Sequence, residues 1–163
     1  MNSRTATFIG QMKHPLKFRV FLFAKLPAAY FAGVRIREID ENKCVVSVPY
    51  KWLSQNPFRS TYFACLSMAA EMSTGSLAMA HLYKIDPPVS MLVIKVESSY
   101  FKKATGRSYF TCEDGPLFAK AIEETIATGE ARSVIARSVG KNKEGEIIAE
   151  FFITWSFKVK SKK

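Results

Sequence analysis

The stretch from Thr61 to Tyr83 constrains the fold most, because it predicts a helix without a charged face. It consists mostly of Ala, Met, Leu, Ser and Phe, with Glu71 as its one acidic residue and no Lys or Arg before Lys84. A helix that is apolar on every side is buried in the interior of a protein. The rest of the chain is therefore expected to enclose this segment.

Glu71 is the first candidate functional residue, because burying a lone carboxylate costs on the order of several kcal/mol unless it is paired, neutralised or reached by water or a ligand. The structural alternative is a glutamate that bonds to a Ser, Thr or backbone group in the core. Asn56, Ser60 and Thr61 lie just upstream and are predicted to cap the helix. Such a helix start leaves backbone N–H groups directed at whatever lies there.

The length of 163 residues and a hydrophobic content of 48% indicate one folded domain and exclude a disordered chain. The apolar segment 20–31 is interrupted by Lys25 and Pro27. It is therefore shorter than the roughly 20 residues that a membrane span requires. We expect a single domain over residues 1–163, in which 1–33 is a helical extension that packs over the domain or lines its ligand cavity, and 158–163 is a frayed basic tail.

Alternating polarity and turn residues predict six strands, at 34–39, 44–50, 89–100, 107–113, 131–139 and 147–157. A short surface helix is expected between Pro116 and Gly129. Six long strands and one fully apolar helix predict an α+β fold in which an antiparallel sheet curls around the buried helix.

The net charge of +10 is compatible with a nucleic acid, an anionic membrane surface or a small anionic ligand as partner. Three widely spaced cysteines fit neither a disulfide framework nor a zinc site, so we expect a reducing compartment, the cytoplasm. The isolated His14 and His81 give no metal cluster. We therefore expect no metal.

The pattern Asn56-x3-Ser60-x-Tyr62-Phe63-Ala64-x6-Glu71 resembles the signature of hotdog-fold thioesterases of the phenylacetate-pathway type. In that family an Asn precedes a small polar residue, a His-Gly-Gly triplet opens the central helix, and an acidic residue lies two turns further in. Here Tyr62-Phe63-Ala64 stands in place of the triplet. The resemblance covers residues 34–157, and the N-terminal helical extension is similar to that of a DUF4442-like branch of uncharacterised thioesterases.

The resemblance implies hydrolysis of an acyl-CoA thioester, with Glu71 as the general base that activates water and Asn56 orienting the water or the thioester. The N–H groups near Phe63 and Ala64 would stabilise the oxyanion. The implied substrate-binding residues are Ser60, Thr61, Tyr62, Phe63 and Ala64. A homodimer would complete the site, alone or within a tetramer.

The basic trio Lys102, Lys103 and Arg107 would bind the phosphates of coenzyme A, which enters as part of the substrate, so no separate cofactor is expected. The alternative is a solvated turn. A hotdog domain that binds an acyl chain or acyl-CoA without hydrolysing it is the main alternative function. Nucleic-acid binding rests on the net charge alone and is not expected. A membrane span is not expected either, because the apolar segment is too short.

Overall fold

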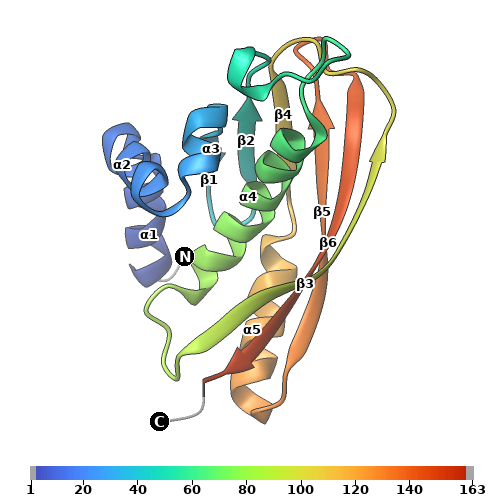
Figure 1. Ribbon diagram of the computed structural model, residues 1–163. Helices are drawn as coiled ribbons and strands as arrows, with labels where there is room; N and C mark the ends of the chain where they lie inside the picture. The colour runs from blue at the N-terminus through green and yellow to red at the C-terminus, as the bar shows by residue number, and fades with distance from the viewer. Residues whose placement is uncertain (1–2, 161–163) are drawn as a thin grey trace.

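The computed structural model describes residues 3–160 and is built on one antiparallel sheet of six strands, which curves around a long helix, α4 (Phe63–Leu82) (Figure 1). The strand order is β1-β2-β4-β5-β6-β3, so β1 and β3 are the edges. The predicted α+β architecture is confirmed. The strands are β1 (Arg35–Ile39), β2 (Cys44–Val48), β3 (Val89–Tyr100), β4 (Ser108–Cys112), β5 (Arg132–Lys141) and β6 (Ile147–Val159).

The buried position of α4 follows from its composition of small and apolar residues. The polar side chains that it does bury find partners inside the protein. Ser73 Oγ lies 2.8 Å from Ser138 Oγ on β5, and the Trp155 indole of β6 donates to Thr74 Oγ1 over 3.0 Å. These bonds fix the helix against the concave face of the sheet.

The start of α4 differs from the prediction in position and in capping. The helix begins at Phe63, with Tyr62 as N-cap and no capping bond from a side chain, so the predicted capping by Asn56, Ser60 and Thr61 is wrong. The Thr61 N–H and hydroxyl both donate to the Ala104 carbonyl, over 2.8 and 3.1 Å. These contacts bind Thr61 to the loop after β3 instead.

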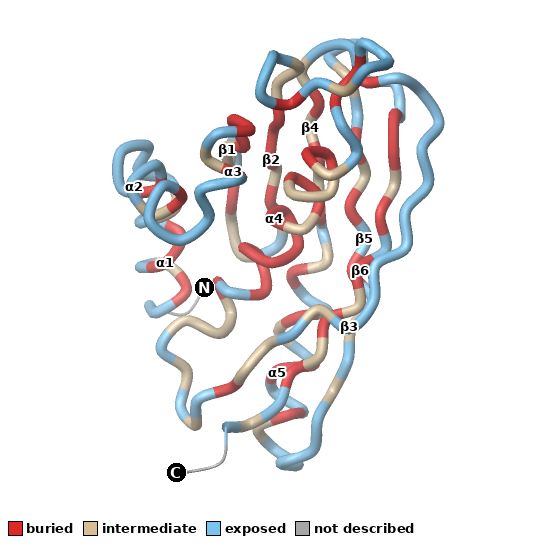
Figure 2. The backbone as a smooth tube through the Cα atoms, viewed as in Figure 1, coloured by how far each residue is buried: buried red, intermediate tan, exposed pale blue. Residues whose placement is uncertain are grey.

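Three helices precede the sheet: α1 (Ser3–Lys13), α2 (Pro15–Lys25) and α3 (Pro27–Ala32). Gly33 ends the last of them with φ at +85°, as its place in the sequence predicts. The group packs beside β1 and α4, and the outer sides of α2 are exposed to solvent (Figures 1 and 2). Within residues 3–160 no helix has both the length and the apolar character of a membrane span.

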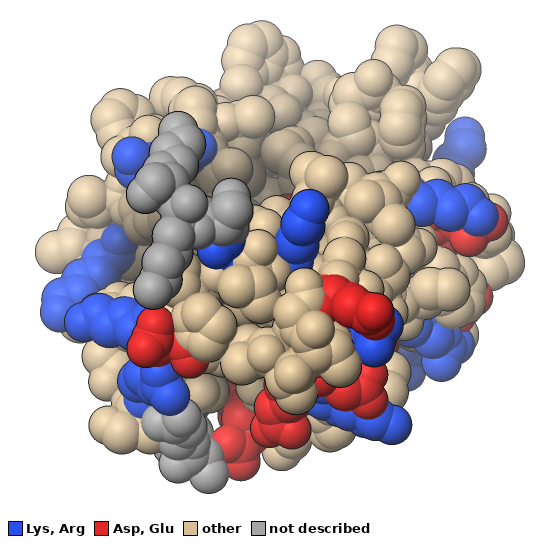
Figure 3. Space-filling model, turned by 90° about the horizontal axis from the view of Figure 1, so that it is seen from below, with Lys and Arg blue, Asp and Glu red and all other residues tan. Residues whose placement is uncertain are grey.

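The charge of the chain is unevenly distributed. On the face shown in Figure 3, basic side chains are interspersed with acidic ones. The N-terminal helices differ, because Glu38 is the first acidic residue of the chain. The positive charge ahead of Glu38 therefore has no acidic neighbour in its own segment.

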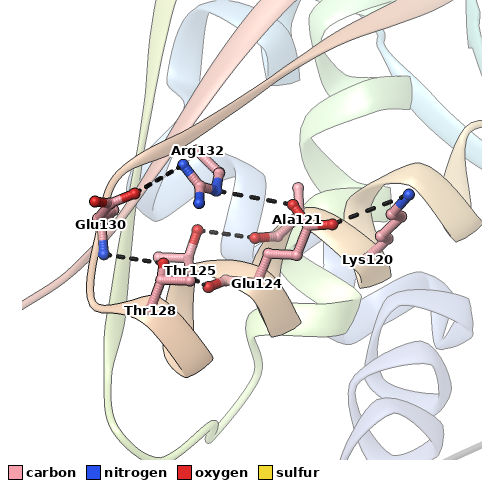
Figure 4. Close-up of polar contacts among 7 residues, drawn as sticks. All are labelled: Lys120, Ala121, Glu124, Thr125, Thr128, Glu130 and Arg132. Atoms are coloured by element: carbon pink, nitrogen blue, oxygen red, sulfur yellow. Dashed lines mark hydrogen bonds and ion pairs between the residues drawn. The ribbon is translucent and has the colours of Figure 1, made fainter.

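Helix α5 (Gly115–Thr128) packs against α4, β5 and β6. Its end is bound to the start of β5 by Arg132, which pairs with Glu124 over 3.7 Å and with Glu130 over 3.1 Å (Figure 4). The last strand, β6, continues to Val159, because residues 158 and 159 pair with the start of β3. The expected frayed tail therefore does not begin at residue 158, and residues 161–163 lie outside the described range.

All three cysteines are buried free thiols. Cys44 and Cys112 lie opposite each other on β2 and β4, and burial raises the pKa of the Cys112 thiol to about 12. Burial also raises the pKa values of Cys44 and Cys65. At neutral pH these thiols are protonated and belong to the core.

Candidate functional site

A cavity of about 560 Å³ lies at the start of α4, and we call it the helix-start cavity. It brings together the loop before the helix, the first turn of the helix and the segment after β3. All but three of the residues predicted from the signature and the basic trio meet here, the exceptions being Glu71, Ala64 and Arg107. The lining residues are Asn56, Pro57, Phe58, Ser60, Thr61, Tyr62, Phe63, Leu66, Tyr100, Phe101, Lys102, Lys103 and Ala104.

Asn56 organises the loop that leads into the cavity. Its Oδ1 accepts hydrogen bonds from the Phe58 N–H over 3.0 Å, and from the Ser60 N–H and hydroxyl over 3.2 Å each. The carbonyl oxygen of the amide is thus already bonded within the loop. A ligand would meet the Nδ2 side of Asn56.

The first backbone donors of α4 adjoin the same cavity. The N–H groups of Phe63 and Ala64 bond to no acceptor in residues 3–160, whereas the Cys65 N–H already bonds to the Tyr62 carbonyl. The positive end of the helix dipole adds to these two donors. The arrangement can stabilise a developing negative charge.

Glu71 lies in a second, smaller cavity of about 70 Å³, the Glu71 cavity, between α4 and the N-terminal helices. This cavity is almost entirely apolar, and methionines supply several of its walls. Its lining residues are Phe8, Met12, Phe18, Phe21, Leu26, Glu71, Met72, Gly75, Ser76, Met79 and Met91.

The Glu71 carboxyl has no hydrogen-bond or ion-pair partner in the described part of the chain. A carboxyl held by a Ser, Thr or backbone group, the structural alternative from the sequence, is not what the structure shows. Desolvation by burial raises the pKa of Glu71 above its ordinary value. The group is therefore a partly buried carboxyl in apolar surroundings that lines a cavity.

The position of the carboxyl is set by two neighbours, Gly75 and Trp155. A methyl group built on Gly75 would lie 2.9 Å from Glu71 Oε1 and 3.2 Å from the Trp155 ring. Trp155 pairs with Val93 of the edge strand β3. Glu71 thus lies on the side of α4 that is nearer to β3.

The two cavities of one chain are separate. Glu71 follows Phe63 by eight positions on α4, which is about 12 Å along a helix axis at 1.5 Å per residue. A water activated by Glu71 is therefore too far from the donors at the start of its own helix to attack a carbonyl bound there. The chain separates groups that the sequence pattern suggested would act together.

The predicted basic trio surrounds one depression of about 370 Å³, which shares Lys102 and Lys103 with the helix-start cavity. Arg107 lines it as well, and Lys143 from the β5–β6 turn adds a further cation. Lys102 forms an ion pair of 2.6 Å with Glu146, and this bond lowers the pKa of Glu146. Glu144 and Glu146 line the same depression, so a ligand in the helix-start cavity would have an excess of cations over carboxylates next to it.

Sequence reasoning missed Lys143 and the N-terminal side chains that enclose Glu71. Lys143 belongs to a hairpin turn some 40 positions from the trio, and nothing in its sequence neighbourhood marks it. Phe8, Met12 and Phe18 read as ordinary apolar helix residues. The only available signal was the general expectation that the N-terminal helices line a cavity.

A family model described as a domain of unknown function, DUF4442, matches residues 17–157. The chain belongs to the DUF4442 family. The predicted membership is therefore confirmed, and the match includes α2 from its third residue, α3 and the sheet up to Phe157 of β6. No curated protein matches the chain.

Solved structures share the fold at low sequence identity. A Pseudomonas aeruginosa protein of unknown function, described as a "probable thioesterase", superposes with a TM-score of 0.75 at 17% identity, over 93% of this chain and 100% of that one. A thioesterase from Haemophilus influenzae gives 0.61 at 9% identity, over 87% and 90%. A mutant thioesterase from P. aeruginosa gives 0.63 at 14% identity, over 92% and 93%. The hotdog fold is thereby confirmed.

Proposed function

We propose that this protein hydrolyses acyl-CoA thioesters to the free acid and coenzyme A. The observation that carries the proposal is the Glu71 carboxyl, which is unpaired among the described residues, has a raised pKa and belongs to a side chain that lines an apolar cavity. A fully buried structural glutamate would be bonded to its surroundings, whereas Glu71 is partly buried and its side chain lines the cavity. The thioesterases among the structures of the same fold support this choice of reaction.

The reaction needs an activated water and a site for the negative charge that develops on the thioester oxygen. Glu71 would accept a proton from water as the oxygen attacks the carbonyl carbon, a role for which a raised pKa is suited at neutral pH. The Phe63 and Ala64 N–H groups would bind the oxyanion. Collapse of the tetrahedral intermediate breaks the carbon–sulfur bond, and the proton held by Glu71 goes to the departing thiolate.

Coenzyme A would lie along the helix-start cavity, with its phosphates at the basic depression. The two hollows share Lys102, Lys103 and Ala104, so one elongated molecule can occupy both. Asn56 would hold the water or the thioester through Nδ2. The exposed rings of Tyr62 and Phe63, 4.9 Å apart, would border the thioester where the family has a His and a Gly.

A second copy of the chain would supply the missing half of each site. Because Glu71 and its own helix start are about 12 Å apart along α4, the base of one copy would serve the helix start of the other. The edge strand β3 is where the copies would join. Its residue Val96 shares the inner face of the sheet with buried Ile153 of β6 and is still 51% exposed, and Tyr100 further along is 44% exposed.

We expect the protein to be a dimer that pairs through β3, because a twelve-residue edge strand with apolar side chains otherwise stays open. Val96→Glu should place a charge in this contact and yield monomers in multi-angle light scattering. The control is Leu117→Glu, on the half-exposed side of α5, which should stay dimeric. A wild-type protein that is monomeric at micromolar concentration would contradict the shared site.

We expect the charge-reversed double variant Lys102→Glu/Lys103→Glu to raise KM for acyl-CoA by roughly five- to tenfold, with kcat changed little. Remote phosphate contacts stabilise ground and transition states alike. Steady-state kinetics with a thiol reagent checks this, and Lys120→Glu on α5, far from the depression, is the matched control. An unchanged KM would remove the trio from the site.

A hotdog domain that holds acyl-CoA without hydrolysing it is the alternative, and the side chains of Tyr62 and Phe63 at the helix start favour it. They stand where the family has a His and a Gly, so they narrow the approach to the oxyanion donors. Equilibrium binding of acyl-CoA without thiol release across chain lengths would select this alternative.

A further inference from the structure

Helix α2 has a second apolar face that is directed away from the core. Phe18 and Leu22 are buried against the domain. On the other side Leu16, Val20 and Phe23 recur at helical spacing and are 67%, 61% and 59% exposed. A surface helix normally presents charged or polar residues there, so this face indicates a partner.

Helix α3 extends the same face. The Phe23 ring packs edge-on against Tyr30 at 5.3 Å and lies 6.3 Å from Phe31, which is itself half-exposed. A depression of about 340 Å³ runs through it, lined by Leu16, Arg19, Val20, Phe23 and Tyr30. We define the α2–α3 face as Leu16, Val20, Phe23 and Phe31.

The N-terminal segment that carries the α2–α3 face contains positive charge only. Lys17 and Arg19 flank the apolar stripe on α2, and Lys13 and Lys25 lie at the ends of α1 and α2. The chain has no Asp or Glu before Glu38. Apolar side chains rimmed by cations are the pattern of a helix that lies in the interface of an anionic membrane.

We propose that the α2–α3 face docks on an anionic phospholipid surface, with Val20 and Phe23 entering the boundary between headgroups and acyl chains and the flanking cations contacting lipid phosphates. Charge complementarity favours lipid over a second copy of the same face. Two copies related by a twofold axis would place Lys17, Arg19 and Lys25 against like charges with no carboxylate between them.

Docking would also connect the membrane to the Glu71 cavity. The opposite side of α2 supplies Phe18 and Phe21 to that cavity, so the helix would lie between lipid and carboxyl. A long acyl chain dissolved in the membrane would then enter past α2. This last step rests on the proposed function, whereas docking itself does not.

The test is flotation of the full chain with vesicles of equal parts phosphatidylcholine and phosphatidylglycerol, against vesicles of phosphatidylcholine alone. We expect binding to the anionic vesicles, weakened roughly tenfold or more in the double variant Val20→Ser/Phe23→Ser because the inserted apolar surface is lost. Leu117→Ser, at a half-exposed apolar position on α5, is the control and should bind like the wild type. Phe23→Trp in a Trp52→Phe background should show a blue-shifted emission on anionic vesicles only.

Three results would overturn the docking proposal. One is the absence of binding to anionic vesicles, and another is equal binding by the double variant, which would assign the attraction to charge elsewhere. The third is a smaller oligomer of the double variant in light scattering, which would make the face a subunit contact. Hydrolysis of a short, water-soluble acyl-CoA does not need a membrane and should be unchanged in the double variant. A wild-type protein that does not hydrolyse this substrate would contradict the proposed function without bearing on docking.

Discussion

We expect Glu71→Gln to lower thioester hydrolysis by on the order of 10²-fold or more while the protein stays folded, because a general base contributes a factor of this size. Gln has the shape of Glu and cannot accept a proton from water. The measurement is steady-state turnover of an acyl-CoA series with a thiol reagent. The wild-type rate should also fall as pH is lowered through the raised pKa of Glu71.

The stability of the same variant tests whether the Glu71 carboxyl is desolvated in the folded protein. The folded-state pKa of Glu71 lies above its ordinary value of 4.5, so between the two values the folded protein binds more protons than the unfolded chain. Ionisation of Glu71 therefore lowers the free energy of unfolding as pH rises. Glu71→Gln should raise Tm relative to wild type at neutral pH, and the difference should vanish near pH 4.5 and below.

A fully active Glu71→Gln protein would contradict the catalytic role, whatever its stability. The binding of acyl-CoA without hydrolysis would then be the better account of the site. An inactive variant with the same Tm as wild type at every pH would support Glu71 as the general base but contradict the desolvation of its carboxyl. Each half of the prediction thus has its own measurement.

The fold was largely predictable because its main determinants are local. The apolar composition of α4, the alternation in the strands and the glycines at 33 and 129 each act within a few residues of their position. The exact start of α4 was not predictable. It depends on the bond from Thr61 to Ala104, which lies 43 positions away.

The candidate site was predictable only in part, for the same reason. The signature identified Asn56, Glu71 and the helix start, but their distribution over two cavities follows from packing. Helices α1 and α2 enclose Glu71, and no short-range pattern relates Phe8 or Phe18 to a residue more than 50 positions later. Spacing along the chain indicated candidate groups, while tertiary contacts decide which of them meet.

Gly75→Ala tests whether hydrolysis depends on the position of the Glu71 carboxyl, because it leaves the carboxyl itself unchanged. The new methyl group would lie 2.9 Å from Glu71 Oε1 and 3.2 Å from the Trp155 ring. The ring is held by its 3.0 Å bond to Thr74, so the more flexible carboxyl is expected to move. Because a misplacement of about 1 Å can cost up to roughly 10²-fold in rate, we expect at least a tenfold loss of hydrolysis with Glu71 itself intact.

The matched control is Gly10→Ala, the same change inside α1, where no heavy atom lies within 4 Å of the added methyl group. An alanine in place of a helical glycine contributes about 1 kcal/mol to the free energy of unfolding. Gly10→Ala should therefore raise Tm and leave hydrolysis unchanged, whereas Gly75→Ala should gain less stability and lose rate. Equal activity of the two variants would mean that the observed place of the carboxyl beside Trp155 is not the one from which it acts.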